Sequence, residues 1–123
     1  MSKRNNALLV DDILISIDRI FLYVKNITEN EFLNNFFTQD AVSRNFEIIG
    51  EASSRLSKEF KEQYDDINWI KVKDFRNKLI HDYFGTDYST VWLIIQNDLK
   101  VLQEKLIDIN KKLPEEIDGT NSQ

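Results

Sequence analysis

His81, the only histidine of the chain, stands in a short polar segment whose residue types suit phosphate chemistry. Arg76 precedes it and is followed directly by Asn77, and Tyr83 comes two residues after the histidine. An arginine offers phosphate a permanently charged, forked donor, and a histidine moves protons near neutral pH. Asn77 adds a neutral donor and acceptor that can orient a phosphate or the imidazole. Together these groups suffice for attack of a ribose 2′-hydroxyl on its own phosphate, which needs proton transfer and a cation but no metal.

The spacing of these residues on a helix indicates how they would meet. At about 100° per residue, Asn77 and His81 share one face of a helix, and Arg76 and Tyr83 share another close to it. Arg76 and His81 are then about 140° apart, which a long arginine closes only in part. Pairing of two such helices across a two-fold axis closes it better, so the spacing predicts a homodimer with a composite groove.

The same segment carries most of the local positive charge. Lys71, Lys73 and Lys78 lie around Arg76, with Asp74 as the one acidic residue among them. We interpret Lys73 and Lys78 as candidates for holding a polyanionic substrate, although a solvated helix face explains the charges equally well. The net charge of −5 argues against a broad nucleic-acid-binding surface.

Several other kinds of chemistry are excluded or disfavoured by the residues present. The chain has no cysteine, which rules out disulfides, thiolate catalysis and cysteine metal sites. One histidine with scattered carboxylates gives no convincing spacing for metal ligands, and no Ser/His/Asp arrangement suggests itself. We therefore expect neither a metal nor a cofactor.

The composition favours one helical domain. Of the 123 residues 41% are apolar and 30% are charged, and there are three glycines and one proline to interrupt helices. No apolar run approaches the roughly 20 residues that span a membrane. The polar start, Met1 to Asn6, does not resemble a signal peptide, and a cytoplasmic protein is expected.

Apolar residues at three- and four-residue steps predict where the first two long helices lie. The stripe from Leu9 to Val24 predicts a helix over residues 6–26. Thr28 and Glu31 form a plausible capping box for a short helix that holds Phe32, Leu33, Phe36 and Phe37. Asp40 is the expected cap of the second long helix, whose stripe ends at Phe60.

Two more long helices follow. Asn68 is the expected cap of a third helix that begins at Trp69 and carries Tyr83, with Gly85 just past its end. Ser89 is the expected cap of a fourth, which stops before Pro114. The pattern predicts an all-α, antiparallel four-helix bundle with an extra short helix, with the domain over residues 1–113 and a flexible acidic tail over 114–123.

The motif segment also resembles a known family. The run from Trp69 to Phe84 looks like the signature of HEPN domains, R-x4-H-x-Y in the HepT form. Residues 46–52 are similar to the second-helix segment of that family, and Asp87 and Val91-Trp92 match its downstream pattern. The resemblance covers roughly residues 7–112.

This resemblance implies a HEPN-like fold and a homodimeric, metal-independent endoribonuclease. It implies the toxin of a type VII-like toxin–antitoxin pair, with a small MntA-like nucleotidyltransferase as its antitoxin. Arg76 and His81 then fall on the ribonuclease residues, Asn77 on the adjoining polar position, and Tyr83 on the tyrosine that the partner AMPylates.

Alternatives remain for the protein and for single residues. A non-catalytic HEPN dimer could be a regulatory or substrate-binding subunit of a nucleotidyltransferase, and a plain helical dimerisation domain would make the motif a coincidence. Gly50, in mid-helix, is expected to permit close helix approach. Glu51 is expected to be structural, bonding to the motif helix, and Trp69 to be a packing anchor, not a base-stacking platform.

Overall fold

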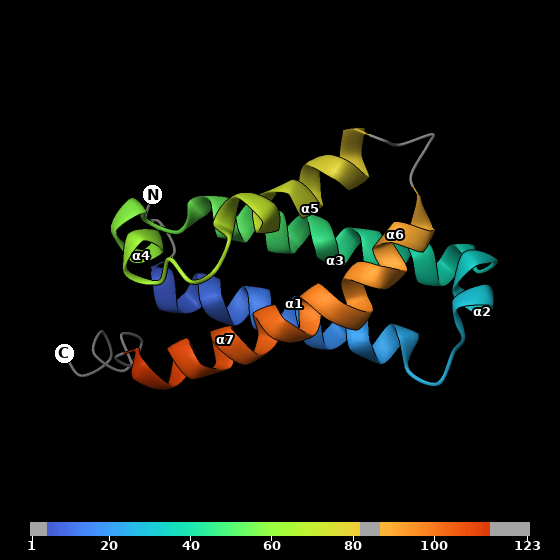
Figure 1. Cartoon of the computed structure of the whole chain (residues 1–123), viewed down its shortest axis with the longest axis horizontal. Coiled ribbons are helices and arrows are strands. Elements are labelled where there is room, and N and C mark those ends of the chain that lie inside the picture. The colour runs from blue at the N-terminus through green and yellow to red at the C-terminus, as the bar shows by residue number, and fades with distance from the viewer. Residues whose placement is uncertain (1–4, 82–86, 114–123) are drawn as a thin grey trace.

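The computed structural model describes residues 5–81 and 87–113, with the side chains of 77–81 left out (Figure 1). The described residues form helices joined by short connections and contain no strand. In chain order the elements are α1 (Asn6–Val24), α2 (Glu29–Leu33), α3 (Phe36–Arg55), α4 (Lys58–Gln63), α5 (Trp69–His81), α6 (Tyr88–Leu93), the π-helical segment η1 (Ile94–Asp98) and α7 (Leu99–Lys112).

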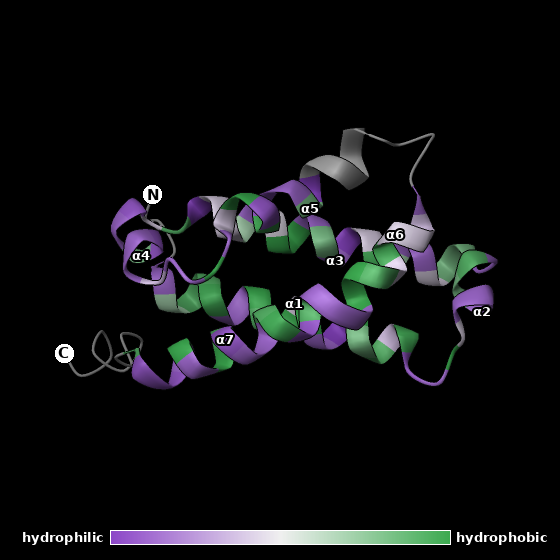
Figure 2. Cartoon of the chain, viewed as in Figure 1, coloured by the Kyte–Doolittle hydropathy of each residue, from purple (hydrophilic) through white to green (hydrophobic). Residues whose placement is uncertain are grey.

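The long helices form a bundle in which α3 is central. It packs along α1 on one side and along α5 on the other, while α7 lies against α1 (Figure 1). Figure 2 shows apolar and polar residues mixed along each long helix, as expected of helices with one buried side. The predicted all-α bundle is confirmed.

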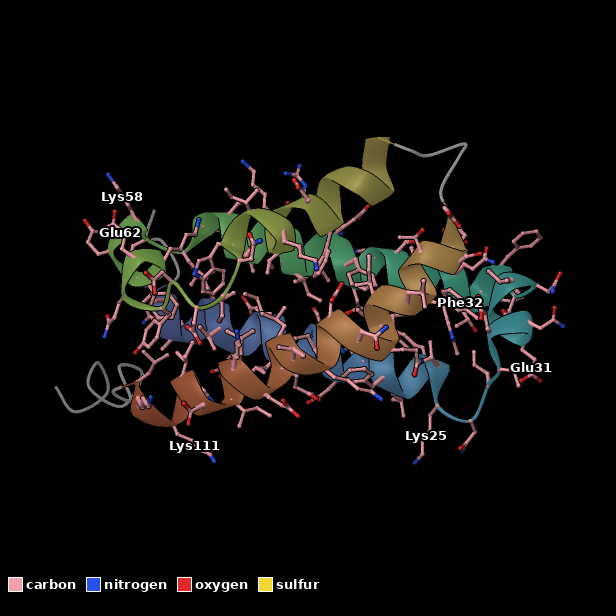
Figure 3. All side chains as sticks on the ribbon, viewed as in Figure 1. Lys25, Glu31, Phe32, Lys58, Glu62 and Lys111 are labelled. Carbon is pink, nitrogen blue, oxygen red and sulfur yellow. The ribbon has the colours of Figure 1, made fainter. Side chains whose placement is uncertain are left out.

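The interior is filled by large aliphatic and aromatic side chains. Phe32 points into the bundle, whereas Lys25, Glu31, Lys58, Glu62 and Lys111 point into solvent (Figure 3). The largest fully buried side chains are Phe32, Phe46, Leu9, Ile13, Ile17, Ile20, Ile49, Ile95, Leu99, Leu106, Val10 and Val42. They come from α1, α2, α3, η1 and α7, and none comes from the described part of α5.

The first half of the chain departs from prediction at its helix boundaries. The capping box of α2 is confirmed, with Thr28 Oγ1 accepting from Glu31 N at 3.1 Å and Glu31 Oε1 accepting from Thr28 N at 2.8 Å. The predicted cap at Asp40 is wrong, because Asn35 Oδ1 accepts from Thr38 N at 3.0 Å and α3 already begins at Phe36. Phe36 and Phe37 therefore belong to α3 and not to the short helix that was predicted to hold them.

The second long helix is also shorter than predicted. It ends at Arg55, and Ser57 Oγ then accepts from Phe60 N at 3.1 Å to cap a separate helix, α4. Asn6 holds this break in place, since its amide donates to Ser57 Oγ and accepts from Ser57 N, both at 3.1 Å. The described bundle therefore has two extra short helices, α2 and α4, where one was predicted.

The last helix begins at Tyr88 and is capped by Asp87, so the predicted cap at Ser89 is wrong. Asp87 accepts from Ser89 N at 3.0 Å and from the Thr90 hydroxyl at 3.0 Å. The Thr90 hydroxyl, followed by the backbone N–H groups, lowers the pKa of the Asp87 carboxyl. Tyr88 then fixes α6 to the bundle, because its hydroxyl lies 3.1 Å from Ser43 Oγ.

The helix from 88 to 112 contains one irregular stretch that the periodicity did not reveal. Over Ile94–Asp98 the hydrogen bonding is π-helical, and Leu99 N donates to Ile94 O. A π-turn accommodates one extra residue in a helix and shifts the faces on either side of it. Among the described helices, none is both long and apolar enough to cross a membrane. Residues 114–123 lie outside the described chain, so the division at 113 stays a prediction.

Candidate active site

The motif helix, α5, is anchored at its first residue. Lys71 N donates to Asn68 Oδ1 at 3.1 Å, which confirms Asn68 as the predicted cap. The Trp69 indole N–H donates to Tyr64 O at 3.1 Å, and its ring centroid lies 6.2 Å from that of Phe60. Trp69 is therefore a packing anchor, as predicted, and it holds the start of α5 against α4.

One turn further on, α5 is held against α3. Val72 and Phe75 are its buried residues in the described part, at 4% and 6% exposure. The Phe75 ring meets Phe46 of α3 edge-on, with centroids 5.4 Å apart and planes at 77°. Aromatic pairs favour this T-shaped geometry, which defines how α5 sits on α3.

Arg76 lies at a close approach of α3 and α5. A Cβ added to Gly50 would overlap the Arg76 Cβ and would stand 3.2 Å from its backbone nitrogen and 3.3 Å from its Cα. The absence of a side chain at Gly50 therefore permits this approach, as predicted. Arg76 itself is half-buried.

The other predicted site residues are only partly described. Asn77, Lys78 and His81 lie on the continuous backbone of α5, but their side chains fall outside the described residues. Tyr83 lies in the segment 82–86, which is also outside them. What the structure brings together is the backbone of the motif through His81, with Arg76 seated on α3.

The predicted basic cluster is only partly free. Lys71 is used by an ion pair, its Nζ lying 3.2 Å from Asp98 Oδ2. Lys73 is exposed, and its charge acts on a second lysine that was not predicted, Lys61 of α4. Burial, and then the charge of Lys73, lower the pKa of Lys61. Within the described residues neither Lys61 nor Lys73 forms an ion pair.

Lys61 was missed because it belongs to a different helix. Sequence separation from the motif gives no hint of its position, and only the folding of α4 against the start of α5 brings it there. Glu51 is exposed, and its bond to the motif helix stays a prediction, because the side chains of residues 77–81 lie outside the described residues.

A cleft of about 210 Å³ lies between the start of α5 and α7, on another side of the motif helix. Its floor includes Val72, Phe75 and Leu102, and its rim charges are already paired. Lys105 Nζ donates to Asp66 O at 2.7 Å and lies 3.9 Å from its carboxylate. Arg76 does not line this cleft. Among described residues, no group of three histidines or carboxylates is placed to hold a metal.

Comparison with known families decides the class of protein. The family model described as Ribonuclease HepT-like matches residues 13–109, which include α5 and most of the bundle. The chain belongs to the HepT-like ribonuclease family. The predicted resemblance is confirmed, and with it the endoribonuclease class at the level of the family.

Several relatives align with this chain over nearly their whole length. A candidate RNase of Methanocaldococcus jannaschii is 39% identical over 86% of this chain and 97% of its own. Another candidate RNase of that organism is 36% identical over 94% of this chain and 99% of its own. A candidate ribonuclease HepT of Thermococcus cleftensis is 36% identical over 89% and 99%. No solved structure matches the chain.

Proposed function

We propose that this HepT-like protein is a metal-independent endoribonuclease that cleaves RNA through attack of the 2′-hydroxyl on the adjacent phosphate. The observation that carries the proposal is the position of Arg76. It is a half-buried arginine held against α3 on the motif helix, in a chain whose family is ribonucleolytic. The contact with Gly50 fixes the point from which the Arg76 side chain starts, and a charged donor held near the scissile phosphate would stabilise the charge that develops on it.

In this mechanism Arg76 donates hydrogen bonds to the non-bridging phosphate oxygens. His81 exchanges protons with the reacting oxygens, taking one from the 2′-hydroxyl or giving one to the leaving 5′-oxygen. The new bond joins O2′ to phosphorus and the broken bond joins phosphorus to O5′. The products are a 2′,3′-cyclic phosphate and a 5′-hydroxyl end. Asn77 orients the phosphate or the imidazole, and Lys73 and Lys78 hold flanking phosphates.

We further propose that the enzyme acts as a homodimer, with α5 of each copy at a shared groove. Ile70 supports this arrangement, because 76% of its surface is exposed. At about 100° per residue, position 70 lies within about 20° of positions 77 and 81 on α5. An exposed isoleucine in line with the polar motif positions is the kind of residue that a second copy covers.

The test of the reaction uses purified protein, RNA and an excess of EDTA. We expect cleavage to continue in EDTA and to leave cyclic or 2′/3′-phosphate ends, and His81→Ala to abolish it while the helical content is retained. The reason is that no other histidine in the chain can replace it. Cleavage that needs metal and leaves 5′-phosphates would refute this mechanism. An inactive wild-type protein that still binds a nucleotidyltransferase would instead support the non-catalytic alternative.

The regulatory part of the proposal rests on the family. We propose that the protein is the toxin of a type VII-like pair, acts in the cytoplasm where it meets cellular RNA, and is neutralised when an MntA-like nucleotidyltransferase AMPylates Tyr83. A bound AMP would add a purine and negative charge beside the substrate groove and repel RNA. Co-expression with such a partner should raise the mass by one or more AMP units, and Tyr83→Phe should block this. A mass increase that persists in Tyr83→Phe contradicts the assignment.

A further inference from the structure

Gly50 occupies a position where a glycine is unfavourable for its own helix. It is buried in α3, five residues before the end of a 20-residue helix. Glycine is the weakest helix former after proline because its backbone loses the most freedom on folding. An alanine would suit α3 considered alone, so the reason for the glycine lies in what packs against it.

What packs against it is the backbone of Arg76 and not a flexible side chain. The three nearest atoms to an added Cβ are the Cβ, the backbone nitrogen and the Cα of Arg76. None of these atoms moves when a side chain changes rotamer. A methyl group at position 50 therefore requires the two helices to separate at this point.

The separation would not be shared evenly along α5. Trp69 is bonded to Tyr64 at the start of the helix, and Phe75 packs edge-on against Phe46 one residue before Arg76. These two interactions hold the first part of α5 in place. The strain from a larger residue at position 50 would consequently fall on Arg76 and on the part of the helix that follows it.

We propose that Gly50 is a positioning residue for the ribonuclease reaction, which sets the depth at which Arg76 sits against α3. This inference rests on the proposed function, because it is the phosphate-binding role of Arg76 that makes its depth matter. Gly50 does not touch substrate itself. It acts through the backbone of Arg76, and its replacement changes where the guanidinium and the residues after it meet the scissile phosphate.

The experiment compares Gly50→Ala and Gly50→Ser with a matched control on the same helix. Ser54→Ala also replaces a poorer helix former by alanine, but position 54 is exposed, and the Ser54 hydroxyl donates to Glu51 O of the same helix. Cleavage of total tRNA in EDTA is followed in single turnover, and Arg76→Ala serves as the reference for removal of the arginine. Helical content and the midpoint of thermal unfolding, Tm, are measured for every variant.

We expect Gly50→Ala to lower the saturating rate by about 10- to 100-fold, as a misplacement of about 1 Å does. The half-saturating concentration should change by less than about threefold, since the weakened hydrogen bonds are those that form in the transition state. Gly50→Ser should be at least as slow, and Ser54→Ala should match wild type. In a crystal structure of Gly50→Ala, the Cα atoms of 50 and 76 should be farther apart.

Other results would overturn the inference. If the glycine is merely tolerated, Gly50→Ala raises Tm through its better helix propensity and cleaves at the wild-type rate. If the role is only structural, the loss of rate matches the loss of folded protein. If wild type cleaves and Arg76→Ala does not, while Gly50→Ala remains fully active, the inference fails and the proposed function stands. If wild type does not cleave RNA, both fail.

Discussion

The first helix and the motif helix are held in the bundle in very different ways. Seven of the 19 residues of α1 are buried, and the residues on its inner face are apolar except for Ser16. In the described part of α5 only Val72 and Phe75 are buried, and Ile70 on its outer side is 76% exposed. The described part of the motif helix packs mainly along α3, with smaller contacts at its start through Trp69 and Lys71, and Ile70 is left open to substrate or a second subunit.

This difference in burial predicts that α1 mainly stabilises the fold, whereas α5 mainly serves the reaction. A fully buried aliphatic side chain contributes about 1.5–3 kcal/mol through removal of its surface from water, so α1 stabilises the fold far more than the described part of α5 does. Substitutions in α1 should therefore change the free energy of unfolding. Substitutions of Arg76 and the polar motif residues of α5 should change the rate of the reaction and leave the fold nearly intact, unlike substitutions of its buried Val72 and Phe75.

Two isoleucines of α1 provide the strongest test of the stability side. Ile17 is fully buried, whereas Ile15 on the opposite side of the helix is 49% exposed. Ile17→Ala should reduce the free energy of unfolding by about 2–5 kcal/mol, because it removes buried methyl groups and leaves a cavity. Ile15→Ala should change it by about 0.5 kcal/mol or less. Equal losses in urea unfolding would show that α1 is not the stabilising element.

Arg76 provides the matching test of the chemical side. Arg76→Ala should reduce RNA cleavage by about 10²–10³-fold, the usual cost of removing a donor that stabilises charge in the transition state. Arg76→Lys should also be strongly impaired, because lysine lacks the bidentate fork. Arg55→Ala, at an exposed position in the last turn of α3, is the control and should retain full activity. A large fall in Tm for Arg76→Ala would contradict the view that Arg76 serves the reaction and not the stability of the fold.

Asn45 provides a further test in α3, the helix that packs against both α1 and α5. Its amide nitrogen donates to Ala41 O at 2.9 Å, but its Oδ1 is buried without a hydrogen-bond partner among the described residues. An unsatisfied buried oxygen is costly, so Asn45→Leu should stabilise the protein by about 1 kcal/mol in urea unfolding. Gln39→Leu should have the opposite sign, because the Gln39 amide donates to Phe32 O at 3.0 Å. Destabilisation by both variants would mean that Asn45 is satisfied in solution.

The smallest effect is expected at the cap of α6, at the periphery of both regions. Because hydrogen bonds lower the pKa of Asp87 in the folded state, its charged form adds stability above the ordinary value of 3.8. That contribution is lost as the pH falls through the lower pKa of the folded state. Asp87→Asn, which keeps a capping oxygen, should have a slightly lower Tm than wild type at pH 7, and the difference should disappear at acidic pH. A difference that is independent of pH would contradict the role of the charge.

Much of this architecture can be predicted from the sequence, because apolar periodicity and helix caps depend on residues that are close together in the chain. The helical periodicity of the apolar residues predicted α1, α3, α5 and the final helix, and Thr28 with Glu31 predicted the cap of α2. Helix boundaries were less predictable. Asn35 and Asp40, or Asp87 and Ser89, are equally good caps by residue type, and the outcome depends on which of them has the extended backbone that a cap requires.

The sequence alone determined the helical class of the fold, the family signature and the identity of the candidate catalytic residues, because these depend on residue types and on spacings within one helix. Only the tertiary structure decided what lies beside those residues. The seating of Arg76 on Gly50, 26 positions earlier in the chain, and the approach of Lys61 to Lys73 both depend on how separate helices pack. Spacing within a helix says which residues share a face, but it carries no information about the backbone that this face will meet.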